Sequence, residues 1–272
     1  MVQSVHVTTT PHTDARSLIA LTHAPSPRLD GCELTFLPVQ RIDQRRAEAQ
    51  HTAYCTLLRE CGARVVQVQG NEAFPDGVFV EDTAVVLDEV AVVTPMGTAS
   101  RRPETTAIEH ALKAFRPVHR LAGPGKLEGG DVLRVDRTLF VGQGSRTDTA
   151  GLKALEAVVA PFGYTIVPVA VTGCLHLKTG VTAVDDGTVL INPDWVDAAC
   201  FRDFQCIHVP TAEPFAANVL RVGQAICMHA GFTETRERLD ARGYRVMSTD
   251  ISEFLKAEAG LTCMSILLAH AE

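Results

Sequence analysis

The sequence predicts an α/β fold in which five modules close into a propeller with pseudo-fivefold symmetry. One observation is an internal repeat: the order strand, tight turn, strand recurs in copies that begin near residues 83, 131, 181 and 218. Repeats of this kind indicate a radial or solenoid array. The other observation is that the two ends of the chain carry complementary parts of a fifth copy. Pairing the N- and C-terminal strands would complete that module and remove an exposed sheet edge, so we expect residues 1–272 to form a single domain.

The N- and C-terminal segments supply the module that closes the ring. Residues 17–22 and 64–68 have the apolar character of strands, and residues 43–62 between them have apolar positions at helical spacing. Residues 262–268 predict a further strand, which we expect to pair beside residues 17–22. Residues 1–16 carry Thr and His but no apolar run, and we expect them to be flexible.

Each of the four internal modules begins with a hairpin, because two apolar strands flank a turn made of the residues that tight turns require. We expect a helix before the last strand of every copy. Pro103 stands where a first-turn proline is tolerated, and Asp148 is a candidate helix cap. The predicted segments of the four modules are 83–87, 90–94, 103–115 and 118–121; 131–135, 138–141, 148–161 and 165–169; 181–184, 189–192 and 206–209; and 218–222, 225–228, 233–242 and 244–247.

The composition excludes several classes of protein. With 25 Lys and Arg against 32 Asp and Glu, the chain has a formal charge of −7 and no basic block, so nucleic acid is not expected as a partner. No apolar run approaches the roughly 18 residues of a membrane helix, and residues 1–16 do not resemble an export signal. We therefore expect a cytoplasmic protein whose eight cysteines are mostly free thiols. Their spacings match no common zinc site, so neither a metal nor a cofactor is expected.

Chemically active residues stand at the entrance of successive hairpins. Glu81 and Asp82 precede the first hairpin, Glu128 begins a Glu-Gly-Gly-Asp run before the second, and His176 lies just before the third. Cys263 lies on the predicted closing strand. In a closed ring these positions meet at one end of the centre. A lone histidine or acidic pair is more often structural, but their joint placement predicts a site with a thiol nucleophile.

Six blocks of the sequence resemble the dimethylarginine dimethylaminohydrolases, which belong to the guanidine-modifying pentein superfamily. The blocks are FPDGVFVED (74–82), SRRPE (100–104), LEGGD (127–131), SRT (145–147), LHLKT (175–179) and LTCMS (261–265). They stand in the family's order and span about residues 17–268, nearly the whole chain. The resemblance implies a five-module α/β propeller, in agreement with the repeats. It also implies hydrolysis of Nω-methylated arginine (asymmetric dimethylarginine or monomethylarginine) to citrulline and dimethylamine or methylamine.

By this resemblance Cys263 is the nucleophile, His176 the general acid and base, and Glu128 the carboxylate that orients the histidine. Thiolate attack on the guanidinium carbon would lead, with loss of the amine, to a thiouronium that water converts to citrulline. Some relatives have Asp at the position of Glu128. No Lys or Arg adjoins Cys263 in the sequence. We therefore expect the cationic substrate itself to lower the pKa of the thiol.

The resemblance also implies which residues bind the substrate. Asp82 and Glu81 are expected to bind the guanidinium group, and Arg101 and Arg146 the α-carboxylate. Asp76 is expected to contact the α-amino end or to support the guanidinium side. The expected partner is this small molecule, while the sequence leaves monomer and homodimer open.

Residues 25–41 lack the periodicity of a helix or strand. A long irregular stretch in a compact domain often forms a lid over a site, and we expect that role here. By the resemblance, Leu34 in this lid contacts the substrate through its carbonyl oxygen. The carbonyl oxygen of Ala257 is expected to reach the α-amino group.

Three other functions stay open on the sequence alone. An arginine deiminase, agmatine deiminase or amidinotransferase belongs to the same superfamily, although agmatine has no carboxylate for Arg101 and Arg146 to bind. A guanidinium sensor on the same scaffold would not need the thiol of Cys263. A thiol-rich metal-binding module would need ligand spacings that the sequence lacks. The preference among mono-, di- and unmethylated arginine is also left open.

Overall fold

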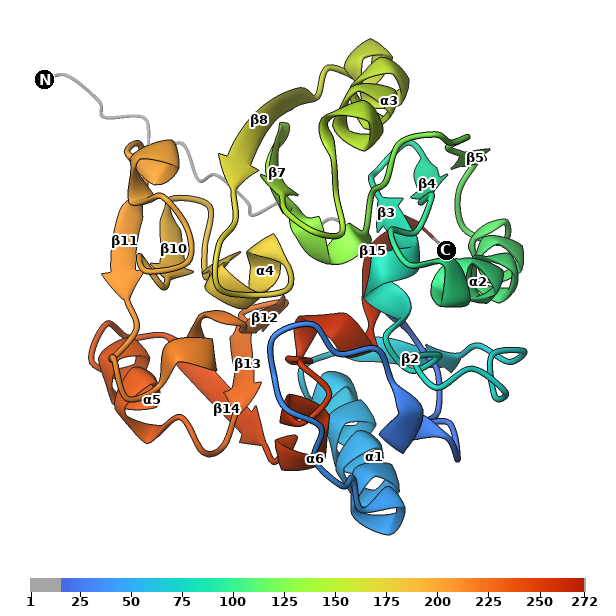
Figure 1. Cartoon of the computed structure of the whole chain (residues 1–272). Coiled ribbons are helices and arrows are strands. Elements are labelled where there is room, and N and C mark those ends of the chain that lie inside the picture. The colour runs from blue at the N-terminus through green and yellow to red at the C-terminus, as the bar shows by residue number, and fades with distance from the viewer. Residues whose placement is uncertain (1–15, 272) are drawn as a thin grey trace, which may run out of the picture.

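Five three-stranded sheets surround a common centre in the computed structural model, which describes residues 16–271 (Figure 1). The strands are β1 (Arg16–Thr22), β2 (Ala63–Gln67), β3 (Ala84–Val86), β4 (Ala91–Val93), β5 (Val118–Arg120), β6 (Val132–Val135), β7 (Thr138–Gln143), β8 (Thr165–Ala170), β9 (Val181–Ala183), β10 (Thr188–Ile191), β11 (Gln205–His208), β12 (Leu220–Val222), β13 (Ala225–His229), β14 (Arg245–Thr249) and β15 (Ile266–Ala271). The sheets are β15-β1-β2, β3-β4-β5, β6-β7-β8, β9-β10-β11 and β12-β13-β14. In each of them the first strand is antiparallel to the second, and the second is parallel to the third. The mixed α/β class is as predicted.

The sheet β15-β1-β2 joins the two ends of the described chain. β15 pairs antiparallel with β1, from Arg16 opposite Ala271 to Leu21 opposite Ile266. On its other side β1 pairs parallel with β2. The prediction that the last strand lies beside the first is confirmed. The segment predicted to be flexible, residues 1–16, lies outside the described residues except for Arg16, where β1 begins.

The α-helices are α1 (Gln44–Glu60), α2 (Thr105–Leu112), α3 (Thr149–Val159), α4 (Leu177–Gly180), α5 (Thr233–Asp240) and α6 (Ser252–Leu255). All four helices that were predicted with residue ranges are present, as α1, α2, α3 and α5. Asp148 caps α3, since its carboxylate accepts the backbone N–H of Gly151 at 2.8 Å. Pro103 lies in a 3₁₀ turn that leads into α2, rather than in the first turn of that helix.

The expectation of a helix in every module is wrong for β9-β10-β11. Between β10 and β11 the chain forms only the 3₁₀ turn η6 (Ala198–Phe201). The side chains of Asn192 and Asp197 there accept backbone N–H groups two residues ahead, at 3.0 and 2.9 Å. Such local hydrogen bonds compete with a helix.

A short helical turn precedes the first strand of each sheet, with at most two residues between them. These turns are η2 (Val80–Thr83), η4 (Gly129–Asp131), α4, η7 (Pro214–Ala217) and η8 (Thr262–Met264). η2 contacts η4 and η8, and α4 contacts η4 and η7, so the five turns lie side by side around the centre. The prediction that Cys263 lies on the closing strand is wrong: Cys263 lies in η8, because the strand begins only at Ile266. The predicted catalytic residues therefore project from these turns or from the residue just before them, not from the strands.

The apolar core supports η8 directly. One cluster of buried residues packs α1 and α6 against this turn, through side chains such as Tyr54, Phe254 and Met264. The hydroxyl group of Tyr54 donates to the carbonyl oxygen of Leu261 at 3.0 Å and lies 2.7 Å from the Oγ atom of Ser265. A buried tyrosine with its hydroxyl paired in this way fixes the backbone on both sides of Cys263. Within residues 16–271, no helix has both the length and the apolar character that a membrane span requires.

Candidate active site

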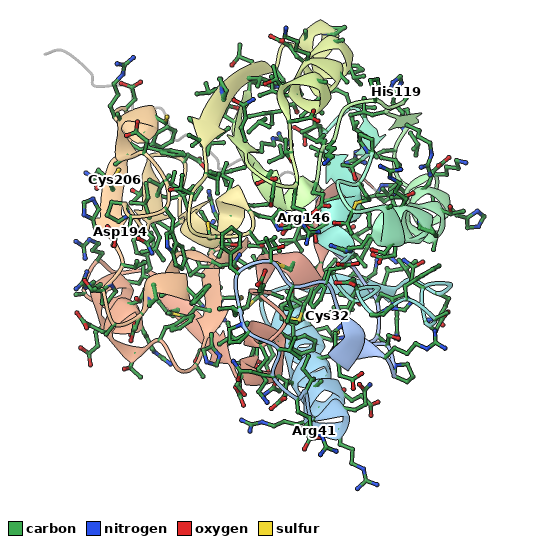
Figure 2. All side chains as sticks on the ribbon, viewed as in Figure 1. Cys32, Arg41, His119, Arg146, Asp194 and Cys206 are labelled. Carbon is green, nitrogen blue, oxygen red and sulfur yellow. The ribbon has the colours of Figure 1, made fainter. Side chains whose placement is uncertain are left out.

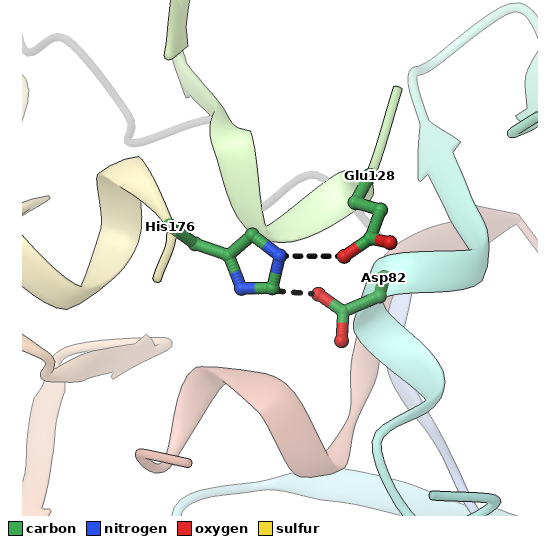
Figure 3. A group of neighbouring side chains, drawn as sticks. All are labelled: Asp82, Glu128 and His176. Atoms are coloured by element: carbon green, nitrogen blue, oxygen red, sulfur yellow. Dashed lines mark hydrogen bonds and ion pairs between the residues drawn. The ribbon is translucent and has the colours of Figure 1, made fainter. Parts of the chain in front are cut away.

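Three residues in or beside these turns meet at the centre of the ring: His176, Glu128 and Asp82 (Figure 3). The Nε2 atom of His176 lies 2.7 Å from Oε2 of Glu128, and its Nδ1 atom lies 3.7 Å from Oδ1 of Asp82. Each of the three residues is at most 3% exposed. The imidazole is thus buried between two carboxylates and hydrogen-bonded to one of them.

The local sequence explains why the turns approach so closely. Glu128 and His176 are the extended residues just before η4 and α4, and Asp82 lies within η2. Gly130 lies two residues after Glu128, and its N–H donates to Oδ1 of Asp82 at 3.2 Å. A Cβ atom on Gly130 would lie 2.6 Å from that oxygen and 2.8 Å from Cγ of His176. Only glycine leaves room for both neighbours.

Replacing Gly130 with alanine is expected to displace His176 from the two carboxylates. We expect a loss of about 1–3 kcal/mol in the free energy of unfolding, as for other overpacked sites. The pKa of His176, measured by NMR, should fall, because the carboxylates that raise it move away.

Gly187→Ala is the matched control, because its Cβ atom would have no contact shorter than the 3.8 Å to Asp185. An unchanged His176 pKa in Gly130→Ala would contradict this account of the close approach.

The charges in this group reinforce one another. Burial alone lowers the pKa of His176, but Asp82, the hydrogen bond to Glu128 and Asp131 outweigh it and raise that pKa to about 9. Burial raises the pKa of Asp82, yet the charges of His176 and Arg101 hold it below its ordinary value. Burial also raises the pKa of Glu128, but the hydrogen bond with His176 holds it below its ordinary value. At neutral pH the imidazole is therefore a protonated acid between two carboxylate anions.

Cys263 lies in the opposite electrostatic situation. Burial is the main cause that raises the pKa of its thiol to about 12, and the charges of Glu81 and Asp82 add to it. The N–H of Gly260, which donates to the Sγ atom at 3.4 Å, and the charge of Lys178 act in the other direction but are weaker. The thiol is therefore neutral at neutral pH, and a thiolate here needs a nearby positive charge.

Cys263 and His176 both line one narrow cavity, whose free volume of about 10 Å³ is room for roughly one water molecule. The cavity is otherwise bounded mainly by charged side chains: the carboxylates of Glu33, Asp76, Asp82 and Glu258, and the guanidinium groups of Arg101 and Arg146. Buried charges of both signs are costly unless they are paired, so this lining suits a ligand that itself carries charges of both signs.

The two arginines differ in how far their donors are already used. Arg101 donates to Oδ2 of Asp82 at 2.7 Å, to the carboxylate of Glu104 at 3.0 Å and to the carbonyl oxygen of Phe79 at 3.0 Å. Arg146 donates to the hydroxyl groups of Thr98 and Thr35 at 2.6 and 3.2 Å. Because those two bonds use two of its five donors, Arg146 has more capacity than Arg101 to bind a further anion. Figure 2 shows Arg146 near the centre of the ring.

The structure does not bring Glu81 into this cavity. Its carboxylate lies 2.6 Å from Nζ of Lys178 and accepts the hydroxyl group of Thr262 at 2.7 Å. It lines a second cavity, of about 340 Å³, which Asp82 does not line. Adjacent residues of a 3₁₀ turn point about 120° apart, so Glu81 and Asp82 cannot both face Cys263 in the same way.

The predicted lid covers the cavity from one side. Its Glu33 lines the cavity, and the backbone N–H of Glu33 donates to Asp76 at 3.2 Å. Burial raises the pKa of Asp76 to about 6, although Arg101 opposes this. Leu34 is half-buried in the lid and is not among the cavity-lining residues, whereas Ala257 is buried and lines it.

Glu33 and Glu258 are cavity residues that the sequence did not single out. Both stand in stretches without a repeat or a motif, and a glutamate in such a stretch is usually solvated. Glu258 directly follows Ala257, which was predicted, but nothing in the spacing indicates that its side chain turns inward.

Asp82, Glu128 and His176 also satisfy the distance requirement of a metal site, since their ligand atoms lie within 4.8 Å of one another. Their present contacts compete with such a role. Glu128 is hydrogen-bonded to His176, and Asp82 forms an ion pair with Arg101 at 2.7 Å. A cation at this position would have to displace both.

Known proteins are similar to this chain in sequence and in fold. A family model described as "N,N dimethylarginine dimethylhydrolase, eukaryotic" matches residues 38–268. The N(G),N(G)-dimethylarginine dimethylaminohydrolase of Pseudomonas aeruginosa is 35% identical over 253 residues, 92% of this chain and 98% of that protein. The protein of the same name from Streptomyces coelicolor is 38% identical over 252 residues, 92% of this chain and 96% of that protein.

Solved structures agree with these matches. The Pseudomonas aeruginosa enzyme, as a cysteine-to-serine mutant complexed with citrulline, is similar with a TM-score of 0.88 and 33% identity, over 92% of this chain and 98% of that one. A dimethylarginine dimethylaminohydrolase with a histidine-to-glycine substitution, in an adduct with S-methyl-L-thiocitrulline, has the same TM-score, identity and coverage. The N-terminal domain of ArgZ, a cyanobacterial arginine dihydrolase, has a TM-score of 0.81 at 22% identity, over 93% of this chain and 99% of that one, and shares the fold.

Proposed function

Because the chain belongs to the dimethylarginine dimethylaminohydrolase family, we propose that it hydrolyses asymmetric dimethylarginine to citrulline and dimethylamine, and monomethylarginine to citrulline and methylamine. The observation that carries the proposal is the buried His176–Glu128 hydrogen bond beside a charged cavity that Cys263 also lines. A pure guanidinium sensor would need the carboxylates of such a cavity but neither the thiol nor the protonated imidazole.

In this proposal the substrate neutralises the cavity at both ends. Asp82 accepts hydrogen bonds from the guanidinium group, with Glu81 behind it as a second negative charge. Arg146 and Arg101 bind the α-carboxylate, and Asp76 receives the α-ammonium group. The carbonyl oxygens of Leu34 and Ala257 are proposed to accept its remaining N–H groups.

The proposed reaction proceeds in two steps. The thiol of Cys263 loses its proton to solvent when the substrate binds, and its Sγ atom attacks the guanidinium carbon. The bond from that carbon to the methylated nitrogen breaks as His176 protonates the departing amine, and a thiouronium remains bonded to sulfur. The neutral His176 then takes a proton from water, whose oxygen attacks the same carbon and releases citrulline and the thiolate. Glu128 holds the imidazole and stabilises its cationic form. The histidine-to-glycine relative found in an adduct with a citrulline analogue supports a covalent intermediate.

Cys263 is proposed to ionise only when a cation binds beside it. The sign follows from its surroundings: burial, Glu81 and Asp82 raise the pKa of the thiol to about 12, so a positive ligand against Asp82 must lower it. We expect the pH midpoint of Cys263 alkylation by iodoacetamide to fall by at least about one unit when millimolar methylguanidinium is added. Alkylation can be followed by mass spectrometry of the Cys263 peptide. Equal midpoints with and without the cation would refute this coupling.

The substrate class is tested by product analysis. Asymmetric dimethylarginine, monomethylarginine, arginine and agmatine are offered separately, and citrulline and free amines are quantified. We expect citrulline and dimethylamine in equal amounts from the first. Ammonia release from arginine or agmatine alone would make the protein a deiminase, and binding of dimethylarginine without any product would make it a sensor.

We further propose that the five sheets form one closed propeller domain with pseudo-fivefold symmetry. The identical strand order of the five sheets supports it. The eight cysteines are all free, which suits a reducing compartment, and we propose a cytoplasmic location. The proposed partner is the small-molecule substrate rather than nucleic acid, in a monomer or a homodimer.

A further inference from the structure

Three consecutive backbone N–H groups of the lid converge on one carboxylate. Those of Thr35, Phe36 and Leu37 lie 3.0, 2.5 and 2.5 Å from Oε1 of Glu258. The Oε2 atom also accepts from Thr35, at 3.1 Å. Hydrogen bonds to an ionised acceptor are about twice as strong as neutral ones, so this carboxylate is a strong anchor for the lid. In Figure 1 the lid, in blue, arches across the middle of the ring in front of α6.

The position of Glu258 in its own segment is unusual. Its φ angle is +57°, a left-handed conformation that few residues other than glycine and asparagine adopt. Such a conformation persists where the surroundings impose it. Here Glu258 follows Ala257, which lines the cavity, and its own side chain is 8% exposed. The segment between α6 and η8 thus lines the cavity with both Ala257 and Glu258, and the carboxylate of Glu258 also contacts the lid.

The lid is also held by groups of the cavity itself. The N–H of Glu33 donates to Asp76, and Arg146 donates to the hydroxyl group of Thr35. With the lid in this position the cavity has room for about one water molecule, which is too small for an amino acid. Movement of the lid would enlarge it. Asp76 and Arg146 are proposed to bind substrate. The carboxylate of Glu258, in contrast, accepts hydrogen bonds from backbone N–H groups of the lid.

We propose that Glu258 is the positioning residue that closes the lid over the substrate. It determines how tightly the substrate is held and acts through the lid, without touching the reacting atoms. The proposal rests on the proposed function for its kinetic part only. A carboxylate that merely supported the local fold would affect the stability of the whole chain but not the lid in particular.

The test compares Glu258→Ala with Glu213→Ala. Glu213 is a matched control because its buried carboxylate also accepts two backbone N–H groups, those of Glu234 and Thr235 at 2.9 and 2.8 Å, and it does not line the cavity. Amide hydrogen exchange of the full chain without substrate is the first measurement. We expect exchange of residues 35–37 to be at least about tenfold faster in Glu258→Ala, and unchanged in Glu213→Ala. Unchanged exchange at residues 35–37, or an increase spread over all five sheets, would overturn the proposal.

Steady-state kinetics on asymmetric dimethylarginine is the second measurement. We expect KM to rise at least about tenfold in Glu258→Ala while kcat changes by less than about threefold. A lower kcat with an unchanged KM would overturn the role in substrate retention. Glu258→Gln, which keeps one oxygen acceptor, should give smaller changes in the same direction and serves if the alanine variant does not fold. The exchange experiment needs no turnover. Inactivity on methylarginines would therefore refute the proposed function but would not change the result of the exchange experiment.

Discussion

Replacing Cys263 with serine is expected to lower turnover of asymmetric dimethylarginine by at least about a thousandfold. A serine hydroxyl group is a far weaker acid than a thiol, and its surroundings already disfavour an anion. Burial and the charges of Glu81 and Asp82 raise the pKa even of the thiol to about 12. Serine has nearly the same size, so substrate binding should persist. Citrulline release measures the first effect, and calorimetric titration with dimethylarginine the second.

Cys206→Ser is the matched control for this variant. Cys206 is a half-buried free thiol in β11, at the periphery of the molecule and far from the centre of the ring (Figure 2). Its replacement should leave turnover within about twofold of the unmodified protein. Activity of Cys263→Ser above about a tenth of that of the unmodified protein would rule out Cys263 as the nucleophile.

Replacing His176 with glycine is expected to separate the two halves of the reaction. With asymmetric dimethylarginine, turnover should fall by about 10² to 10⁴-fold, because the departing amine must be protonated. With S-methyl-L-thiocitrulline the leaving group is methanethiolate, a far weaker base than the anion of an amine, so it departs without protonation. The first step should therefore proceed, and the thiouronium should accumulate because no base activates water. Intact-protein mass spectrometry measures the adduct.

His119→Gly controls for the loss of an imidazole in general. His119 is exposed on β5 at the periphery of the ring (Figure 2), and we expect normal turnover without a lasting adduct. Rapid hydrolysis of the adduct in His176→Gly would show that another group activates the water. Failure to form any adduct would show that His176 is needed already for the attack.

The charge distribution links these two predictions. The raised pKa of His176 keeps the acid protonated, and the raised pKa of Cys263 keeps the thiol neutral until a cation arrives. Asp82 is the group common to both, because its charge raises both pKa values. A substrate guanidinium that pairs with Asp82 would favour the thiolate at the moment when the electrophilic carbon lies beside it. The proposed coupling would thereby limit the reactivity of the thiol to the occupied site.

Much of the fold could be predicted because the sequence repeats its hairpins. Turn residues such as Asp136 and Gly223 mark the hairpins. The apolar character of residues 262–268 predicted a strand that had to pair with another segment. The missing helix between β10 and β11 could not be predicted from the repeat, since the local hydrogen bonds of Asn192 and Asp197 that compete with it are not part of the repeat. Helix propensity is a weak guide where such side chains compete with the backbone.

The sequence predicted which residues meet at the centre but not the direction in which each side chain points. The shared position of Asp82, Glu128 and His176 before successive strands brings them together, as the topology required. Glu81 has the same position in the sequence but turns to Lys178, because neighbouring residues of a tight turn point apart. Glu258 was missed, since its left-handed backbone directs the side chain to the lid and no periodicity signals it.

The central claim, a thiouronium on Cys263 during hydrolysis of methylated arginine, is tested most directly by quenching the protein with acid during turnover of asymmetric dimethylarginine. Intact mass spectrometry should find a fraction of the protein heavier by the substrate minus dimethylamine, and peptide mapping should locate the addition on Cys263. The fraction should disappear once the substrate is exhausted, as citrulline and dimethylamine reach equal amounts. Citrulline formation with no such adduct, or with the adduct on another residue, would contradict the account.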